Sequence, residues 1–108
     1  MIPEIPSTAS SKTSPVSIED LARALGDVTR WRLLWELGQG EPLPVLELAR
    51  RVGRSPTLTS KHMGILRKAG LVLAGYGRLY QLAPAIRPQP GSRLADLGHC
   101  LLKLDVPM

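Results

Sequence analysis

The chain has 108 residues, a formal net charge of +5 and one cysteine, which predicts a single domain with one modest core and no internal disulfide. Its charge is unevenly placed: residues 48–95 contain nine Lys or Arg and no acid, while the remainder holds nine acids and five bases. The block is therefore +9 and the rest −4 (five minus nine), which favours a polyanionic partner. Phe is absent and only two Trp and two Tyr occur, so few aromatic side chains are available to stack on the bases of single-stranded nucleic acid. The expected polyanion is therefore a nucleic-acid duplex.

Residues 1–16 are predicted to form a disordered tail, because Pro, Ser and Thr dominate this segment and few bulky apolar residues occur in it. The tail lacks the basic start and apolar run of a secretory signal, and no segment has the length and apolar character needed to span a bilayer. We therefore expect a cytoplasmic protein with no membrane partner and one folded domain over residues 17–105.

Three helices are predicted in the first half of this domain. The first begins after Ser17 and the second after Asp27, both residues that cap helix N-termini. Apolar residues cover so much of the second helix that we expect it to be packed on more than one side. The third covers residues 45–52, where an i, i+3, i+4, i+7 apolar stripe ends at Gly53.

A fourth helix is predicted from Pro56 to Ala69, since a Ser-Pro pair is a strong helix start. Only Gly53, Arg54 and Ser55 separate it from the third helix. Two short helices joined by a three-residue turn containing Gly are typical of a helix-turn-helix unit, whose second helix enters the major groove.

A short hairpin and a last helix complete the predicted elements. Strands at residues 71–73 and 79–82 flank a glycine-rich turn, and Arg78 at its tip is placed to reach a DNA backbone or minor groove. Leucines at residues 94–104 predict a final helix with an apolar interface. The fold class is therefore mainly α with a small β-hairpin wing: a winged helix-turn-helix with five helices.

The outward face of the fourth helix carries hydroxyls and cations around Gly64, with no acid to repel phosphate. Its apolar side gathers Leu58, Ile65, Leu66 and Ala69, with Met63 at the edge. His62 falls near that apolar side, so two alternatives stay open for it: a histidine packed in the core, or a contact to a DNA base. The predicted DNA-binding residues, from this helix, the preceding turn and the wing, are Arg54, Ser55, Thr57, Thr59, Ser60, Lys61, His62, Arg67, Lys68 and Arg78.

Two segments carry a family resemblance. LARALGDVTRWRLLWEL resembles the opening of the ArsR/SmtB-type winged helix-turn-helix repressors, and RSPTLTSKHMGILRKAGLV is similar to that family's recognition helix and exit into the wing. The resemblance spans residues 18–82. It implies a homodimeric repressor that binds a palindromic operator and pairs through the first and last helices, with candidate interface residues Leu21, Leu25, Leu94, Leu97, Leu101 and Leu104.

Many members of that family sense metals, and this chain departs from them. Where a sensor carries Cys-x-Cys, the chain has Pro44, Val45 and Leu46, so no thiolate is available there. Asp96, His99 and Cys100 fall at i, i+3 and i+4 of the predicted last helix and are weak metal candidates, with a capping Asp beside a half-buried His–Cys pair as the alternative. We expect no cofactor, and a redox role for Cys100 stays open.

Catalysis has little support, because the two histidines are far apart and neither a carboxylate pair nor a phosphate-binding glycine loop is present. The expected function is a DNA-binding transcriptional regulator that is not an enzyme. The alternative is a winged-helix protein-interaction module without sequence-specific DNA binding, and a module that binds structured RNA also stays open.

Overall fold

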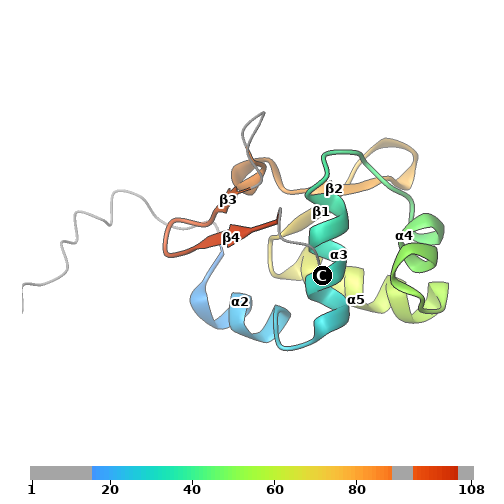
Figure 1. The fold of residues 1–108 in the computed structure, drawn as a ribbon, viewed down its shortest axis with the longest axis horizontal. Coiled ribbons are helices and arrows are strands. Elements are labelled where there is room, and N and C mark those ends of the chain that lie inside the picture. The colour runs from blue at the N-terminus through green and yellow to red at the C-terminus, as the bar shows by residue number, and fades with distance from the viewer. Residues whose placement is uncertain (1–15, 89–93, 105–108) are drawn as a thin grey trace, which may run out of the picture.

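The computed structural model describes residues 16–88 and 94–104, so the predicted tail, apart from Val16, lies outside the described residues. This part of the chain contains four α-helices, two antiparallel hairpins and two short 3-10 turns (Figure 1). The helices are α2 (Ile18–Ala24), α3 (Val28–Leu37), α4 (Val45–Val52) and α5 (Pro56–Lys68). The strands are β1 (Val72–Ala74), β2 (Tyr80–Leu82), β3 (Leu94–Asp96) and β4 (Leu101–Lys103), and the 3-10 turns are η1 (Tyr76–Arg78) and η2 (Pro84–Ile86).

Three helices begin at the caps that the sequence predicts. The Ser17 side chain accepts a hydrogen bond from the Asp20 N–H at 3.0 Å, and the Asp27 carboxylate accepts one from the Thr29 N–H at 2.7 Å. Ser55 caps α5 by accepting from the Leu58 N–H at 3.1 Å. Each such cap stabilises its helix by about 1 kcal/mol, because it satisfies a backbone donor that has no partner inside the helix.

The turn between α4 and α5 has the predicted length. Gly53 ends α4 in the left-handed conformation, with φ 68° and ψ 36°, and the Arg54 N–H donates back to the Ala49 carbonyl at 3.1 Å. A side chain at that backbone conformation costs about 1 kcal/mol or more. Gly53 therefore sets the angle at which α5 leaves α4.

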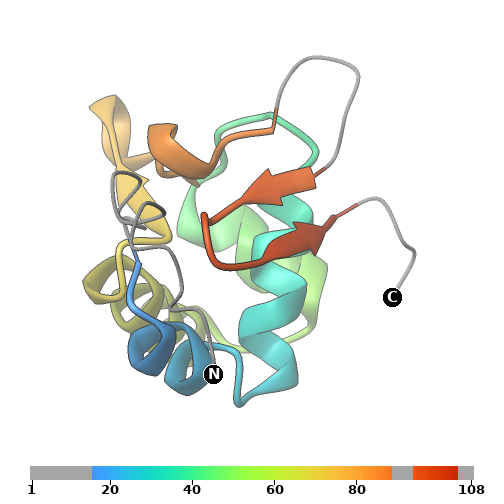
Figure 2. The same ribbon diagram turned by 90° about the vertical axis from the view of Figure 1, so that its left-hand side faces the viewer.

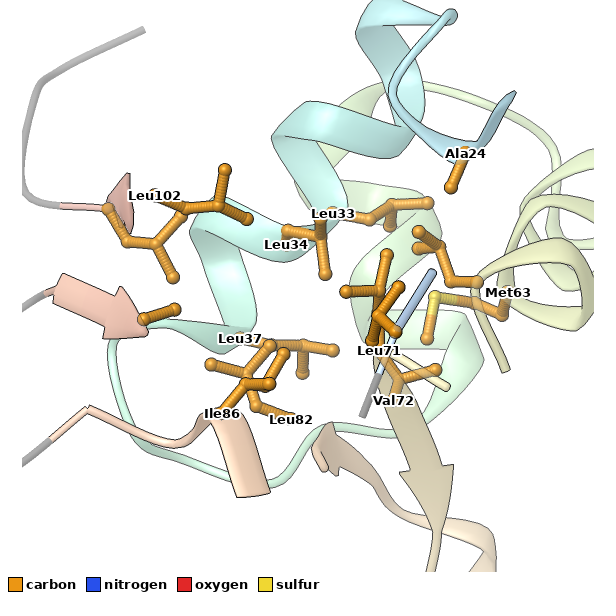
Figure 3. Close-up of a cluster of buried hydrophobic side chains, with 14 of the residues drawn as sticks. Ala24, Leu33, Leu34, Leu37, Met63, Leu71, Val72, Leu82, Ile86 and Leu102 are labelled. Carbon is orange, nitrogen blue, oxygen red and sulfur yellow. The ribbon is translucent and has the colours of Figure 1, made fainter. Parts of the chain in front are cut away.

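Helix α3 lies at the centre of the core, as its wide apolar surface predicts. It packs against α4, α5 and β2, and Leu33, Leu34 and Leu37 are buried (Figure 3). The side chains that surround it come from α4, α5 and both hairpins and include Leu48, Val52, Met63, Leu66, Leu71, Leu82, Ile86 and Leu102. The prediction that this helix is covered on more than one side is confirmed.

The first hairpin, β1–β2, follows α5 as predicted and forms the wing. Its register pairs Val72 with Leu82 and Ala74 with Tyr80. The loop before α4 joins it, because Leu43 and Tyr80 exchange two backbone hydrogen bonds of 2.8 and 2.9 Å. The wing is thereby fastened to the helix-turn-helix unit along one strand.

The predicted last helix is wrong: residues 94–104 form a second hairpin, β3–β4, in which Leu94 pairs with Lys103 and Asp96 with Leu101. Its turn closes through the Leu97 N–H and the Cys100 carbonyl at 2.9 Å, and the Asp96 carboxylate accepts from the Gly98 N–H at 2.9 Å. Gly98 has a φ of 90°, a conformation that an α-helix excludes. The part of the chain described by the structure therefore has four helices rather than five.

This second hairpin lies over α3 (Figure 2). Gly38, at the end of α3, leaves room for the chain that follows the hairpin, because a Cβ on Gly38 would lie 2.8 Å from Leu104 Cδ1 and 2.9 Å from Leu104 Cβ. On the other side, His99 Nε2 lies 2.7 Å from the Val16 carbonyl oxygen. Val16, which the sequence assigns to the tail, is buried in the core.

Candidate nucleic-acid interface

The outward face of α5 carries the polar residues predicted for it. Thr57, Ser60, Lys61, Arg67 and Lys68 are exposed. The inward face presents residues at i, i+3, i+4 and i+7 to the core, namely Thr59, His62, Met63 and Leu66. The apolar side is shifted from the predicted one, since Met63 is fully buried and Leu58 is 39% exposed.

Thr59 was predicted to contact DNA, but the structure places it in the core. Its side chain has no exposed surface, because it shares the inward stripe of α5 with Met63 and Leu66. Being near the helix start did not place it outward. Thr59 belongs to the core and is removed from the candidate interface.

His62 lies in the packed position that the sequence left open, but its partner is a side chain. Its Nδ1 atom lies 3.0 Å from Arg30 Nη1. A guanidinium can only donate hydrogen bonds, so Nδ1 of His62 accepts from Arg30. The contact holds α5 against α3.

Arg30 is a positioning residue that the sequence reasoning missed. Besides His62, its guanidinium donates to the Ala24 carbonyl at 2.7 Å and to the Arg23 carbonyl at 3.3 Å. Those carbonyls lie at the end of α2, where the last carbonyl groups of a helix lack N–H donors from within the helix. One side chain thus joins α2, α3 and α5. Arg30 lies inside the LARALGDVTRWRLLWEL segment that carries the resemblance, but the segment itself does not reveal these partners.

Asp27 stands next to this contact. The Thr29 N–H that binds its carboxylate, and to a smaller extent the nearby His62 and Arg30, lower the pKa of Asp27 below its ordinary value. The start of α3 therefore keeps a negative charge beside the Arg30–His62 pair.

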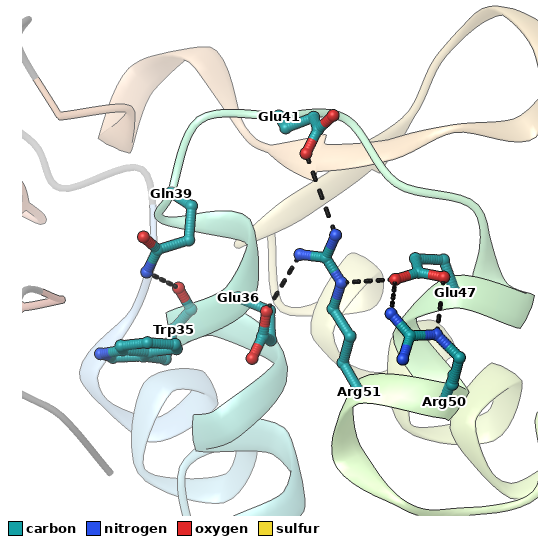
Figure 4. Close-up of polar contacts among 7 residues, drawn as sticks. All are labelled: Trp35, Glu36, Gln39, Glu41, Glu47, Arg50 and Arg51. Atoms are coloured by element: carbon teal, nitrogen blue, oxygen red, sulfur yellow. Dashed lines mark hydrogen bonds and ion pairs between the residues drawn. The ribbon is translucent and has the colours of Figure 1, made fainter.

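Two arginines at the end of α4 are held by acids (Figure 4). Glu47 accepts from Arg50 Nε at 3.0 Å and from Arg51 Nε at 2.7 Å, and Arg51 Nη1 lies 3.2 Å from Glu36 Oε1 on α3. The hydrogen bonds from Arg50 and then Arg51 lower the pKa of Glu47 to about 2. Arg51 therefore ties α4 to Glu36 on α3, whereas the ion pair of Arg50 lies within α4.

The remaining cations of the helix-turn-helix unit stay available. Within residues 16–88 and 94–104, Arg54, Lys61, Arg67 and Lys68 form no ion pair. Along α5, Lys61, Gly64, Ile65, Arg67 and Lys68 line an open hollow of about 510 Å³. Three positive side chains with no acid on one helix face suit a phosphate backbone.

Gly64 lies in the middle of this face. A Cβ built there would meet nothing within 4 Å, so no contact among the described residues requires glycine. A glycine inside a helix costs about 1 kcal/mol relative to alanine. Its presence favours a partner whose surface approaches the α5 backbone closely.

The wing tip adds two exposed side chains. Arg78 has a positive φ of 59°, and Tyr76 is 99% exposed. Tyr76 was not among the predicted contact residues, although its place beside Arg78 in the glycine-rich turn could have identified it as a candidate.

The predicted dimerisation leucines separate into two groups. Leu21, Leu97 and Leu104 are buried in the core and Leu25 packs against it, whereas Leu94 and Leu101 are 38% and 60% exposed. Pairing through a last helix is ruled out by the β3–β4 hairpin, which changes the geometry of Asp96, His99 and Cys100 as well. These three share a hairpin rather than one helical face, and the described residues contain no group of three ligand-type side chains placed to hold a metal.

Comparison with known proteins agrees with this geometry. Residues 25–73 match a family model described as a helix-turn-helix domain, a span that covers α3, α4, α5 and the start of β1. No curated protein matched the chain. The chain therefore contains a helix-turn-helix domain, a class that suggests a DNA-binding regulator, and the narrower ArsR/SmtB resemblance stays a prediction. None of the described helices has the length and apolar character to cross a membrane.

Proposed function

We propose that this protein is a sequence-specific DNA-binding transcriptional regulator that places α5 in the major groove. The outward face of α5 carries the proposal: Lys61, Arg67 and Lys68 form no ion pair among the described residues, no acid lies on the helix, and Gly64 leaves the backbone open. In such a unit, side chains near the start of the second helix meet base edges and the cations hold the phosphates. We assign Thr57, Ser60 and Lys61 to the bases and Arg54, Arg67, Lys68 and Arg78 to the backbone.

The finer proposal is a homodimeric repressor that binds a palindromic operator. A dimer lets two copies of α5 enter successive major grooves about 34 Å apart. Since residues 94–104 form a hairpin rather than a helix, we place the pairing surface on the outward face of β3–β4, where Leu94 and Leu101 share one side of the hairpin. Replacing Leu101 with Glu should then yield monomers in light scattering, whereas an unchanged mass would contradict this pairing surface.

The experiment that tests the function is a binding titration with a fluorescent duplex from the protein's own upstream region. It is run with and without excess random duplex and across a salt series. We expect binding that resists the competitor and an affinity whose logarithm falls with log salt by about 0.9 per phosphate contacted. An RNA duplex of the same sequence should not compete, because its deep, narrow major groove does not admit a helix.

Two variants separate base contacts from phosphate contacts. Lys61→Ala should lower affinity and blur the base preference, while Arg67→Ala should weaken all duplexes alike and reduce the salt slope by about 1 per protomer. Arg32→Ala is the matched control, because Arg32 is an exposed cation of α3 outside the interface. Binding that random duplex removes at every salt concentration would contradict the proposal and favour the protein-interaction module. We propose no catalytic activity for the chain.

A further inference from the structure

A groove lies between α2 and α5, on the side of the recognition helix away from the wing's tip residues. It has a volume of about 390 Å³ and is lined by Asp20, Arg23, Ala24, Ile65, Lys68 and Ala69. Figure 2 shows the two helices beside each other at this place. Sites for small molecules are typically about 300–1,000 Å³ and mostly apolar with a few polar groups, so the groove is large enough for a compact ligand.

The floor of the groove is apolar. Ala24 is buried, and Ile65 and Ala69 are half-buried. A ring or a branched alkyl group placed there would cover apolar surface that water now contacts, which is favourable by the hydrophobic effect. The floor therefore suits a compact apolar body.

The rim of the groove is positive. Asp20 and Arg23 form an ion pair at 3.1 Å, which leaves Lys68 as the excess charge. Lys68 makes no ion pair within the described residues. The Asp20–Arg23 pair is also loosely held, since the Arg23 side chain is 72% exposed and such surface pairs contribute little. The rim thus presents one uncompensated ammonium group next to an apolar floor.

We propose that this groove binds a small organic acid, with the carboxylate on Lys68 and a compact apolar body on Ala24, Ile65 and Ala69. The charge of Lys68 favours an anion over a neutral molecule of the same shape, and a volume of about 390 Å³ suits a compact one. Lys68 and Ile65 also line the hollow on the outward face of α5. The acid would therefore occupy a cation that the DNA proposal assigns to phosphate, which makes the groove a candidate site for a signal.

The test uses the full chain without DNA, so its outcome is independent of whether the protein binds an operator. Benzoate is titrated into the ¹⁵N-labelled protein, with benzamide as the neutral molecule of the same shape. We expect backbone amide shifts at the groove residues, with a Kd of about 1 mM for benzoate and binding at least about 10-fold weaker for benzamide. Equal binding of the two molecules, shifts located elsewhere, or no saturable shift would each overturn the proposal.

A variant pair assigns the charge. Lys68→Met should weaken benzoate binding about 10-fold or more and leave the weak benzamide binding unchanged. Arg32→Met removes one exposed cation outside the groove and should leave benzoate binding as it was. The same spectra show whether each variant is folded, and benzoate binding that survives Lys68→Met in a folded protein would overturn the proposed role of the ammonium group.

Discussion

Gly64 is the residue at which stability and function are expected to move in opposite directions. Since a Cβ meets nothing within 4 Å there, Gly64→Ala should raise the free energy of unfolding by about 0.5–1 kcal/mol through helix propensity. The same methyl group should lower operator affinity by about 10-fold if DNA approaches the α5 backbone, as proposed. Urea unfolding and the duplex titration measure the two effects. A stabilised variant with unchanged affinity would show that DNA does not come close at this position.

Arg30 gives a second prediction at the residue scale. Arg30→Met removes the donor to Ala24 and His62 and leaves partly buried acceptors without partners, which should cost about 1–3 kcal/mol of stability. A double-mutant cycle with His62→Leu should recover a coupling energy of about 1 kcal/mol, because the two side chains form one contact. Strictly additive losses in thermal or urea unfolding would argue against that contact.

The sequence supports much of the site at this scale, but not all of it. Spacing on a helical wheel places Ser60, Lys61 and Arg67 outward correctly, because at 100° per residue they fall together on the side of α5 opposite the buried stripe. The prediction for Thr59 is wrong because it followed from the residue's place near the helix start, although the spacing puts Thr59 on the buried stripe with Met63 and Leu66. Arg30 was missed because its partners lie on two other helices, which no local pattern reveals.

At the scale of elements, the ion pairs of Glu47 within α4 should be acid-sensitive. Hydrogen bonds from Arg50 and Arg51 hold the pKa of Glu47 at about 2, below its ordinary value of 4.5. A carboxylate with a lowered folded-state pKa contributes stability above its unfolded pKa, and that contribution is lost as the pH falls from about 4.5 to about 2. Melting temperatures of the native protein and of Glu47→Gln should therefore differ near neutral pH and converge in acid. Parallel curves over this range would contradict the assignment.

The wing and the last hairpin show why element prediction succeeded once and failed once. Residues 71–82 contain a glycine-rich turn between two short apolar runs, and these runs do not fit a helical pattern equally well. Leucines at 94, 97, 101 and 104 fit a helix, whereas 95, 97, 102 and 104 are the positions that the hairpin buries. The apolar residues of this segment fit both the helical and the strand spacing. The turn at Gly98, where the Asp96 carboxylate accepts a hydrogen bond, favours the hairpin.

At the scale of the whole molecule, Gly38 joins the second hairpin to the helix-turn-helix unit. Because Leu104 Cβ lies 2.9 Å from the position of a Cβ on Gly38, Gly38→Ala should destabilise the protein by about 1–3 kcal/mol through overpacking. Gly64→Ala is the matched control, as the same change in a helix with open space around it. Urea unfolding of both variants should give shifts of opposite sign, and a stabilised Gly38→Ala variant would mean that the hairpin does not pack on α3 in solution.

The contact between residues that are far apart in sequence also affects how the protein is made. Residue 99 reaches back 83 positions to Val16, and Leu104 covers the end of α3. The matched helix-turn-helix segment is complete at residue 73, but its central helix keeps one side uncovered until about 30 more residues have been synthesised. During synthesis, the ribosome thus presents a recognition helix before the domain that holds it has closed, and chaperone contacts should concentrate on the bare side of α3 during that interval.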